Sequence, residues 1–167
     1  MAQISRPAYI WKPSPNFKVP LSPRKISCVV IHATATHRIE SPAAWLCDPI
    51  AKASAHYLIG LDGKILYLVE EKNIAWHAGI SSWRGVPNVN NFSIGIELVN
   101  PNDGQTPYPY EQVRATVDLC VPICKENGIK SCDVIGHADV APGRKNDPLA
   151  FVWDEFRTYL RGGGIDG

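Results

Sequence analysis

Two histidines and one aspartate of this chain are residues of the types that bind zinc. His32 ends a nearly continuous apolar run, His137 closes a shorter one, and Asp147 lies ten positions later in a loop stiffened by prolines. Two neutral imidazoles and a carboxylate suit zinc, whereas calcium and magnesium prefer mostly oxygen ligands. Three protein ligands leave a fourth position for water, as in catalytic zinc sites. Each residue alone has an ordinary explanation as a core histidine or a solvated turn, but together they predict one zinc ion per chain.

A glutamate and a lysine could complete a hydrolytic site around that metal. Glu97 lies in an apolar strand, and its side chain should point opposite to those of Ile96 and Leu98. Burial there would raise the pKa of its carboxyl group and a nearby zinc would lower it, a balance that suits a base acting on water. Lys145 could donate to the oxyanion that forms when a carbonyl is attacked. The alternatives are a surface glutamate on a strand and a solvated lysine in a loop.

An aromatic and basic loop lies in the middle of the chain. Trp76, His77, Trp83 and Arg84 occur within it, among glycines. Indole faces stack on sugar rings and peptide planes, so the loop is predicted to form one wall of a substrate groove. The alternative is that the tryptophans cap the core beneath a long loop. His56, inside a predicted strand, is interpreted as an orienting or core residue rather than a metal ligand.

The elements that must position these side chains are predicted from strand and helix patterns, which alternate along the chain. Strands are predicted at 26–32, 55–61, 64–69, 93–99 and 133–136. Asp62-Gly63 should form a two-residue hairpin turn between the second and third strands. Helices are predicted at 110–127, with a kink at Pro122, at about 149–160, and starting near Ser41-Pro42. This order predicts an α/β domain whose sheet is covered by helices.

Length and composition restrict the class of protein. The 167 residues suit one domain at 26–161, preceded by a proline-rich extended lead-in at 1–25 and followed by a flexible tail at 162–167. Because 17 basic side chains face 16 acidic ones, no broad positive field should attract nucleic acid or an anionic membrane. The apolar runs are far shorter than the roughly 20 residues of a membrane span, and no apolar signal core is visible at the N-terminus. Five cysteines without a disulfide pattern fit a reducing compartment, so the predicted location is cytoplasmic.

Five segments, in this order, resemble the zinc-dependent N-acetylmuramoyl-L-alanine amidases. That family includes cell-wall recycling amidases, periplasmic amidases, many phage endolysins and the animal peptidoglycan recognition proteins. The matched segments, between about Val29 and Trp153, are 30–32, 54–59, 75–79, 91–98 and 136–148. Five matching segments in the same order are not expected by chance.

The resemblance implies a mixed β-sheet flanked by helices, the peptidoglycan recognition protein-like fold. It also implies that His32, His137 and Asp147 hold zinc over a peptidoglycan groove. In the family, water at the zinc attacks the amide between N-acetylmuramic acid and the L-alanine of the stem peptide. Glu97 matches the family's acid/base glutamate, and Lys145 matches its oxyanion-stabilising lysine.

One branch of the family uses a tyrosine just before the histidine that corresponds to His56 and lacks the strand glutamate. Here Ala55 holds that place and Glu97 is present, so the chain resembles the glutamate branch. The expected partner is peptidoglycan or a muropeptide, bound by a monomer. The residues predicted to bind substrate are Trp76, His77, Trp83, Arg84 and Asn91.

Two other functions compete with an active amidase. A peptidoglycan recognition module without catalysis is disfavoured because all three ligand positions and Glu97 are present. An unrelated zinc amidohydrolase is disfavoured because the groove segments match as well. The sequence leaves open whether the substrate is soluble anhydromuropeptide in the cytoplasm, polymeric wall in the periplasm, or the wall of a phage host.

Overall fold

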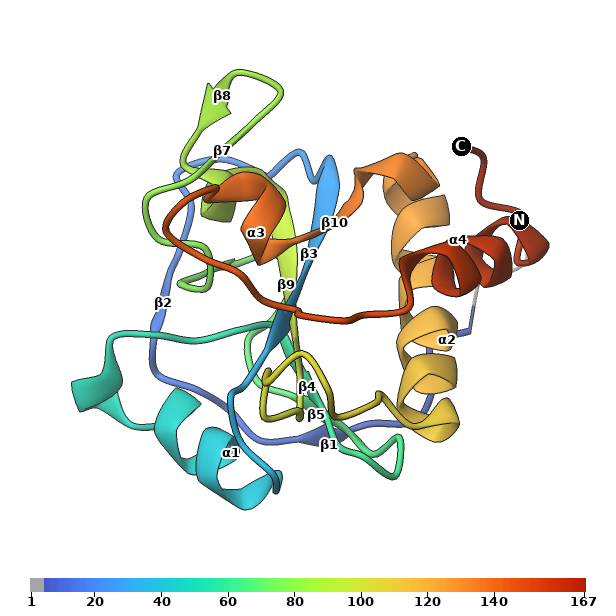
Figure 1. Cartoon of the computed structure of the whole chain (residues 1–167). Coiled ribbons are helices and arrows are strands. Elements are labelled where there is room, and N and C mark those ends of the chain that lie inside the picture. The colour runs from blue at the N-terminus through green and yellow to red at the C-terminus, as the bar shows by residue number, and fades with distance from the viewer. Residues whose placement is uncertain (1–4) are drawn as a thin grey trace.

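A mixed β-sheet of six strands lies at the centre of the computed structural model, which describes residues 5–167 (Figure 1). From edge to edge, the strands are β1 Ile10–Trp11, β5 Ile65–Tyr67, β4 Tyr57–Ile59, β9 Ser93–Leu98, β3 Cys28–Ala33 and β10 Val134–Gly136. The strands β4, β9, β3 and β10 are mutually parallel, whereas β5 runs antiparallel to β4. The predicted α/β fold with a mixed sheet is therefore confirmed.

The central strands β3 and β9 are buried on both faces, which explains their nearly continuous apolar sequences. All residues from Cys28 to His32 are buried, and in β9 only Glu97 is partly exposed. The two strands pair over six residues, and in this register His32 lies beside Glu97. The middle of the sheet thus carries two polar side chains side by side at its carboxyl end.

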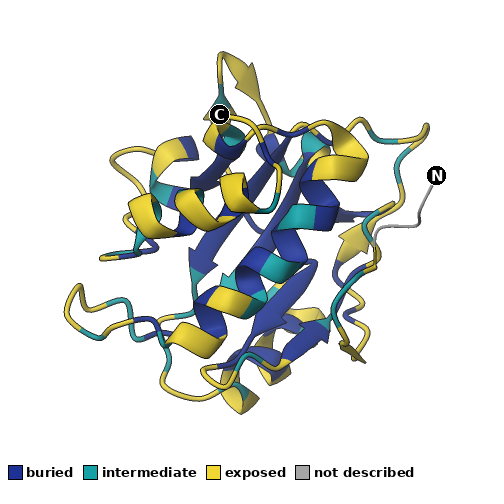
Figure 2. Cartoon of the chain, turned by 90° about the vertical axis from the view of Figure 1, so that its right-hand side faces the viewer, coloured by how far each residue is buried: buried dark blue, intermediate teal, exposed yellow. Residues whose placement is uncertain are grey.

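Helices cover both faces of this sheet. On one face, α2 Tyr110–Asn127 and α4 Trp153–Gly162 pack against each other and against apolar side chains of β3 and β9. In Figure 2 the sides of these helices that face the sheet are buried and their outer sides are exposed. On the other face, α1 Glu40–Leu46 packs on β4 and β5 through Ala43 and Leu46. A short helix, α3 His137–Val140, begins immediately after β10.

The two long helices differ in how well local signals predict their ends. α2 spans the predicted residues 110–127, continues through Pro122 and ends at Gly128, whose φ of 65° is left-handed. The predicted start of α4 at about residue 149 is wrong, since the helix begins at Trp153. Ala150 has a φ of 54°, which a right-handed helix does not allow.

The hairpin between β4 and β5 is longer than the predicted two-residue turn. The N–H of Gly60 donates to Lys64 O at 2.9 Å, and the N–H of Gly63 donates to Gly60 O at 3.1 Å. Residues 61–63 therefore form a three-residue loop, with Gly63 in the left-handed conformation at φ 79°. Gly63 thus lies in the turn as predicted, but the loop has three residues instead of the predicted two.

The described part of the lead-in, from residue 5, and the C-terminal tail are held more closely than their sequences predict. The first four residues of the proline-rich lead-in lie outside the described residues. In the rest of it, β1 pairs with β5, and β2 Phe17–Lys18 pairs with β6 Ile74–Ala75. In the tail, Ile165 is buried and Asp166 O accepts a hydrogen bond from the N–H of Ser131 at 2.7 Å. The tail is packed against the domain instead of loose.

The cysteines of the described residues are all free thiols. Cys28, Cys120 and Cys124 are buried, and burial raises the pKa of Cys124 to about 12, as expected for an inert core thiol. Within residues 5–167, no helix has the length and apolar character needed to cross a membrane.

Candidate functional site

The carboxyl ends of β3, β9 and β10 meet at one edge of the sheet, where α/β folds commonly place their ligand sites. Paired residues of adjacent parallel strands point to the same face, so His32 and Glu97 lie side by side. His137 follows β10 directly as the first residue of α3. The loop that follows returns to the same edge because the N–H of Ala138 donates to Asp147 O at 2.9 Å.

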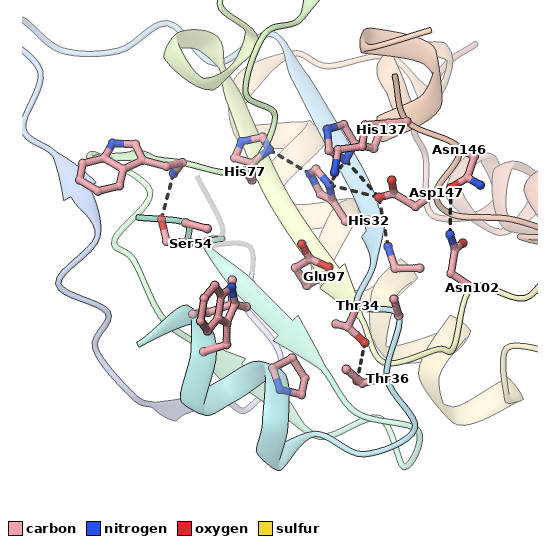
Figure 3. A pocket seen from close by; sticks show the side chains of 18 of the residues that line it. His32, Thr34, Thr36, Ser54, His77, Glu97, Asn102, His137, Asn146 and Asp147 are labelled. Atoms are coloured by element: carbon pink, nitrogen blue, oxygen red, sulfur yellow. Dashed lines mark hydrogen bonds and ion pairs between the residues drawn. The ribbon is translucent and has the colours of Figure 1, made fainter. Parts of the chain in front are cut away.

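Three of the predicted residues converge there with one atom each (Figure 3). Nδ1 of His32 lies 2.9 Å from Nδ1 of His137. Oδ2 of Asp147 lies 3.1 Å from Nδ1 of His137 and 3.5 Å from Nδ1 of His32. All three side chains are buried. The structure therefore brings together the whole ligand set that the sequence predicts.

The chemistry of these three atoms fits a zinc ion. Nε2 of His137 lies 3.2 Å from Ala78 O, and because a carbonyl only accepts, Nε2 is the donor of this contact; in the tautomer with its proton on Nε2, Nδ1 offers a lone pair. Burial is the main cause that lowers the pKa of His32 to about 4, so the ring of His32 is neutral at neutral pH. Two imidazole nitrogens and one carboxylate oxygen are ligand types that zinc accepts, and the three atoms are near enough to one another for one ion to contact all of them.

Glu97 adds an unpaired carboxylate oxygen beside this cluster. Its Oε2 atom is buried and has no hydrogen-bond partner among the described residues. Burial, and then the charge of Asp147, raises the pKa of Glu97 to about 8, although Lys145 acts in the opposite direction. Figure 3 shows the side chain of Glu97 next to His32. A carboxylate with a pKa near neutral pH and a free oxygen can exchange a proton with a bound molecule.

An open cavity of about 860 Å³ lies over the three converging residues and Glu97. Lys145 and Arg144 line it from the loop that also carries Asp147. Trp76 lines it from the segment after β6, so this predicted groove residue does lie at the cavity. Trp45, which is 56% exposed on α1, lines it as well. The cavity thus offers charged groups near the cluster and two indole rings for apolar contact.

Arg144 joins two walls of this cavity. Its Nη2 atom donates to Ala78 O at 2.6 Å and to Ile80 O at 2.7 Å. Ala78 O also accepts from His137, so one carbonyl connects a candidate metal ligand to the loop at 143–147. This contact holds the loop of Asp147 and Lys145 against the segment at 75–80.

Three of the predicted groove residues, Trp83, Arg84 and Asn91, do not line the cavity, so the structure does not support them as substrate contacts. Nε1 of Trp83 and Nε of Arg84 both donate to Oδ1 of Asp133, at 2.9 and 2.8 Å. Asp133 precedes β10, at the end of the strand opposite to His137. Trp83 packs on a core cluster there, which supports the alternative of a tryptophan that caps the core. Asn91 is exposed in the turn of 3-10 helix before β9.

His77 lies at the cavity but faces inward. Its Nδ1 atom lies 3.0 Å from Nε2 of His32, and its Nε2 atom lies 3.0 Å from Oγ of Ser93. Both ring nitrogens are therefore occupied within the protein, and the ring is only 9% exposed. His77 therefore contacts His32 through a hydrogen bond and does not offer a substrate in the cavity the free ring nitrogen that the sequence suggests. His56 is a core residue that accepts from the N–H of Gly95 at 3.0 Å.

Several residues that line the cavity were not predicted from the sequence. Trp45 could have been found as an aromatic residue on the outer face of a short amphipathic helix. The others are small polar residues of loops, whose direction depends on distant contacts. They are Thr34, Thr36, Ser54, Asn102 and Asn146. Asn102 donates to Asn146 at 3.1 Å, which couples the loop after β9 to the loop of Asp147 (Figure 3).

Known proteins share both sequence and fold with this chain. The model of the N-acetylmuramoyl-L-alanine amidase family, Amidase_2, matches residues 22–150. The amidase AmiD of Escherichia coli K12 is 39% identical over 78% of the chain, which spans about half of AmiD, 52%. The 1,6-anhydro-N-acetylmuramyl-L-alanine amidase AmpD of Salmonella typhimurium SL1344 is 34% identical over 89% of the chain and 88% of AmpD.

A solved structure agrees with these sequence relationships. It is the complex of Escherichia coli AmiD with anhydro-N-acetylmuramic acid-L-Ala-D-γ-Glu-L-Lys, 36% identical to this chain. It superposes with a TM-score of 0.75 over 88% of the chain and 60% of AmiD. The fold predicted from the five sequence segments is therefore confirmed.

Proposed function

This chain belongs to the N-acetylmuramoyl-L-alanine amidase family, and on that premise we propose that it is a zinc-dependent hydrolase of soluble muropeptides. The bond cleaved is the amide between N-acetylmuramic acid and the L-alanine of the stem peptide. One observation carries this proposal. Three converging acceptor atoms lie beside the unpaired carboxylate oxygen of Glu97, beneath an open cavity.

Nδ1 of His32, Nδ1 of His137 and Oδ2 of Asp147 would hold one zinc ion. Zinc, when bound, supplies a Lewis acid that activates water and polarises the substrate carbonyl. The protein keeps these atoms in place from the opposite side. Ala78 O holds the ring of His137, and the N–H of Ala33 donates to Oδ2 of Asp147 at 3.4 Å. Such outer contacts orient the ligands and set the tautomers of the histidines.

Glu97 is the proposed acid and base of the reaction. Its free Oε2 takes a proton from water as the carbonyl is attacked, and then returns a proton to the nitrogen of the leaving L-alanine. The rigid strand β9 holds this oxygen beside His32 without a competing protein partner. Lys145, on the loop of Asp147, is proposed to stabilise the negative charge that develops on the carbonyl oxygen.

The substrate is proposed to lie across the cavity, with its apolar faces on Trp76 and Trp45. Both indole rings line the cavity, and aromatic faces stack on sugar rings and peptide planes. The names of the relatives support a small substrate, since AmpD is a 1,6-anhydro-N-acetylmuramyl-L-alanine amidase and AmiD was solved with an anhydromuropeptide. A cytoplasmic location and a monomeric state remain predictions from the sequence.

Release of stem peptide, followed by chromatography, tests this function. The zinc-loaded protein should cleave soluble anhydromuropeptide faster than intact sacculi. His137→Ala should remain folded, lose stoichiometric zinc and lose cleavage, because two ligands bind zinc much more weakly than three. His37→Ala, which removes an exposed histidine outside the site, is the matched control. Stoichiometric zinc in His137→Ala would overturn the ligand set, and a zinc-loaded wild type that binds but cleaves neither substrate would be a recognition module.

A further inference from the structure

A hydrogen-bond chain leads from the candidate metal ligand His32 into the core. Nε2 of His32 lies 3.0 Å from Nδ1 of His77, and Nε2 of His77 lies 3.0 Å from Oγ of Ser93. Oγ of Ser93 in turn lies 2.7 Å from Val89 O. All four residues are buried. Each contact is a normal hydrogen-bond distance, so the chain is continuous from the site to the backbone of Val89.

The last contact decides the direction of the whole chain. A carbonyl cannot donate, so the single hydroxyl proton of Ser93 goes to Val89 O. Ser93 Oγ therefore accepts from Nε2–H of His77, which leaves a lone pair on Nδ1 of His77. That lone pair accepts from Nε2–H of His32. The remaining nitrogen of His32, Nδ1, then carries the lone pair that faces His137 and Asp147.

The ring of His77 is confined to this orientation by β9. A Cβ atom added at Gly95 would clash with Cγ of His77, so the ring lies directly against the glycine. The backbone of the ring's segment is fixed by Asn90, whose Oδ1 accepts from the N–H groups of His77 and Ala78 at 3.2 and 2.8 Å. Ser93, Gly95 and Glu97 are two residues apart in β9 and therefore lie on the same face of the strand. This face carries the serine that ends the hydrogen-bond chain, the glycine against which His77 packs, and the proposed acid/base.

We propose that His77 is a positioning residue for the metal: it accepts the Nε2 proton of His32 and so keeps the Nδ1 lone pair of His32 directed at the zinc site. This inference rests on the proposed zinc site, but it assigns His77 a role apart from substrate contact. In the other tautomer of His32, Nδ1 would carry the proton and could not ligate a metal until it lost that proton. Contacts of this kind orient metal ligands, and losing one typically weakens metal affinity by about 10- to 100-fold.

The affinity for Zn²⁺ alone, measured by competition with a chelator, tests this role without relying on catalysis. His77→Leu removes the acceptor and should weaken zinc binding by about 10- to 100-fold. His77→Asn places a side-chain oxygen near the former Nδ1 and should recover part of that loss. His37→Ala should bind zinc as the wild type does. Equal zinc affinity in folded wild type, His77→Leu and His77→Asn would overturn the proposal.

The tautomer of His32 gives a second and independent test. In the zinc-free full-length protein, long-range ¹H–¹⁵N spectra should show the proton of His32 on Nε2. In Ser93→Ala, His77 loses its acceptor, and the His32 signals should shift toward a mixture of tautomers. A proton on Nδ1 of His32 in the wild type would contradict the chain. If the wild type binds no zinc, the proposed function fails, and the tautomer still decides the role of His77.

Discussion

Two polar clusters of this molecule are linked to Ser93, one directly through Arg24 and the other through His77, and they differ in their balance of donors and acceptors. In the Arg24 cluster, one guanidinium donates to five backbone carbonyls, those of Glu71, Asn73, Asn90, Asn91 and Ser93. Burial lowers the pKa of Arg24 to about 10, so the group remains charged at neutral pH. In the metal cluster of His32, His137 and Asp147, three acceptor atoms converge, and no lysine or arginine of residues 5–167 pairs with them.

The difference separates a polar cluster that is satisfied within the protein from one that could accept a cation. A guanidinium has five N–H donors and no acceptor, so one arginine satisfies a group of carbonyls and leaves nothing for a ligand. Three converging acceptors repel one another unless a cation lies among them. Both clusters are polar, although Arg24 is only partly buried and the three residues of the other cluster are all buried. The balance of donors against acceptors distinguishes the Arg24 cluster from the proposed metal site.

The largest expected effect of a single change is on catalysis at the metal cluster. Glu97→Gln keeps the shape of the side chain but removes the proposed base, so turnover should fall by about 10² to 10⁴. Zinc content and muropeptide affinity should be retained. The measurement is stem-peptide release together with a metal count, with the exposed Glu111→Gln as the control. Cleavage near the wild-type rate by zinc-loaded Glu97→Gln would remove Glu97 from this role.

The Arg24 cluster should instead respond in stability. Arg24→Met removes the donor that these carbonyls share and should lower the free energy of unfolding by about 3 kcal/mol, the upper range for orphaning buried polar groups. Denaturant unfolding of the zinc-free protein measures this change. The neighbouring Lys25→Met, at an exposed position, should alter stability little. If Arg24→Met is as stable as Lys25→Met, the cluster does not have the structural role assigned to it.

A smaller effect should separate the two tryptophans that the sequence treats alike. Trp76→Ala should weaken muropeptide binding by about 1 to 3 kcal/mol, because its ring lines the cavity. Trp83→Ala should leave binding unchanged and lower the thermal midpoint, since its ring packs on the core and its N–H pairs with Asp133. Calorimetric titration and thermal unfolding of both variants measure the contrast. Weaker binding by Trp83→Ala alone would reverse the assignment.

The sequence by itself determined the parts of this protein that depend on short-range patterns. The apolar run before His32 predicts a buried strand, and the position of Glu97 between Ile96 and Leu98 predicts its face, because side chains alternate along a strand. The helix at 110–127 follows from its periodicity and from Gly128 at its end. The proposed zinc ligand set is predicted from residue types at the ends of such elements, and the structure brings its three side chains together.

Only the tertiary structure decided where the loops point. Trp76 and Trp83 are seven positions apart, yet one lines the cavity and the other pairs with Asp133 at the opposite end of β10. The inward orientation of His77 depends on Gly95 and Ser93, which only the pairing of distant strands brings beneath it. Loops lack a repeating pattern, so their side chains are directed by contacts between residues far apart in the sequence. The Arg24 cluster depends on tertiary structure in the same way, because its carbonyls come from two separate segments of the chain, 71–73 and 90–93.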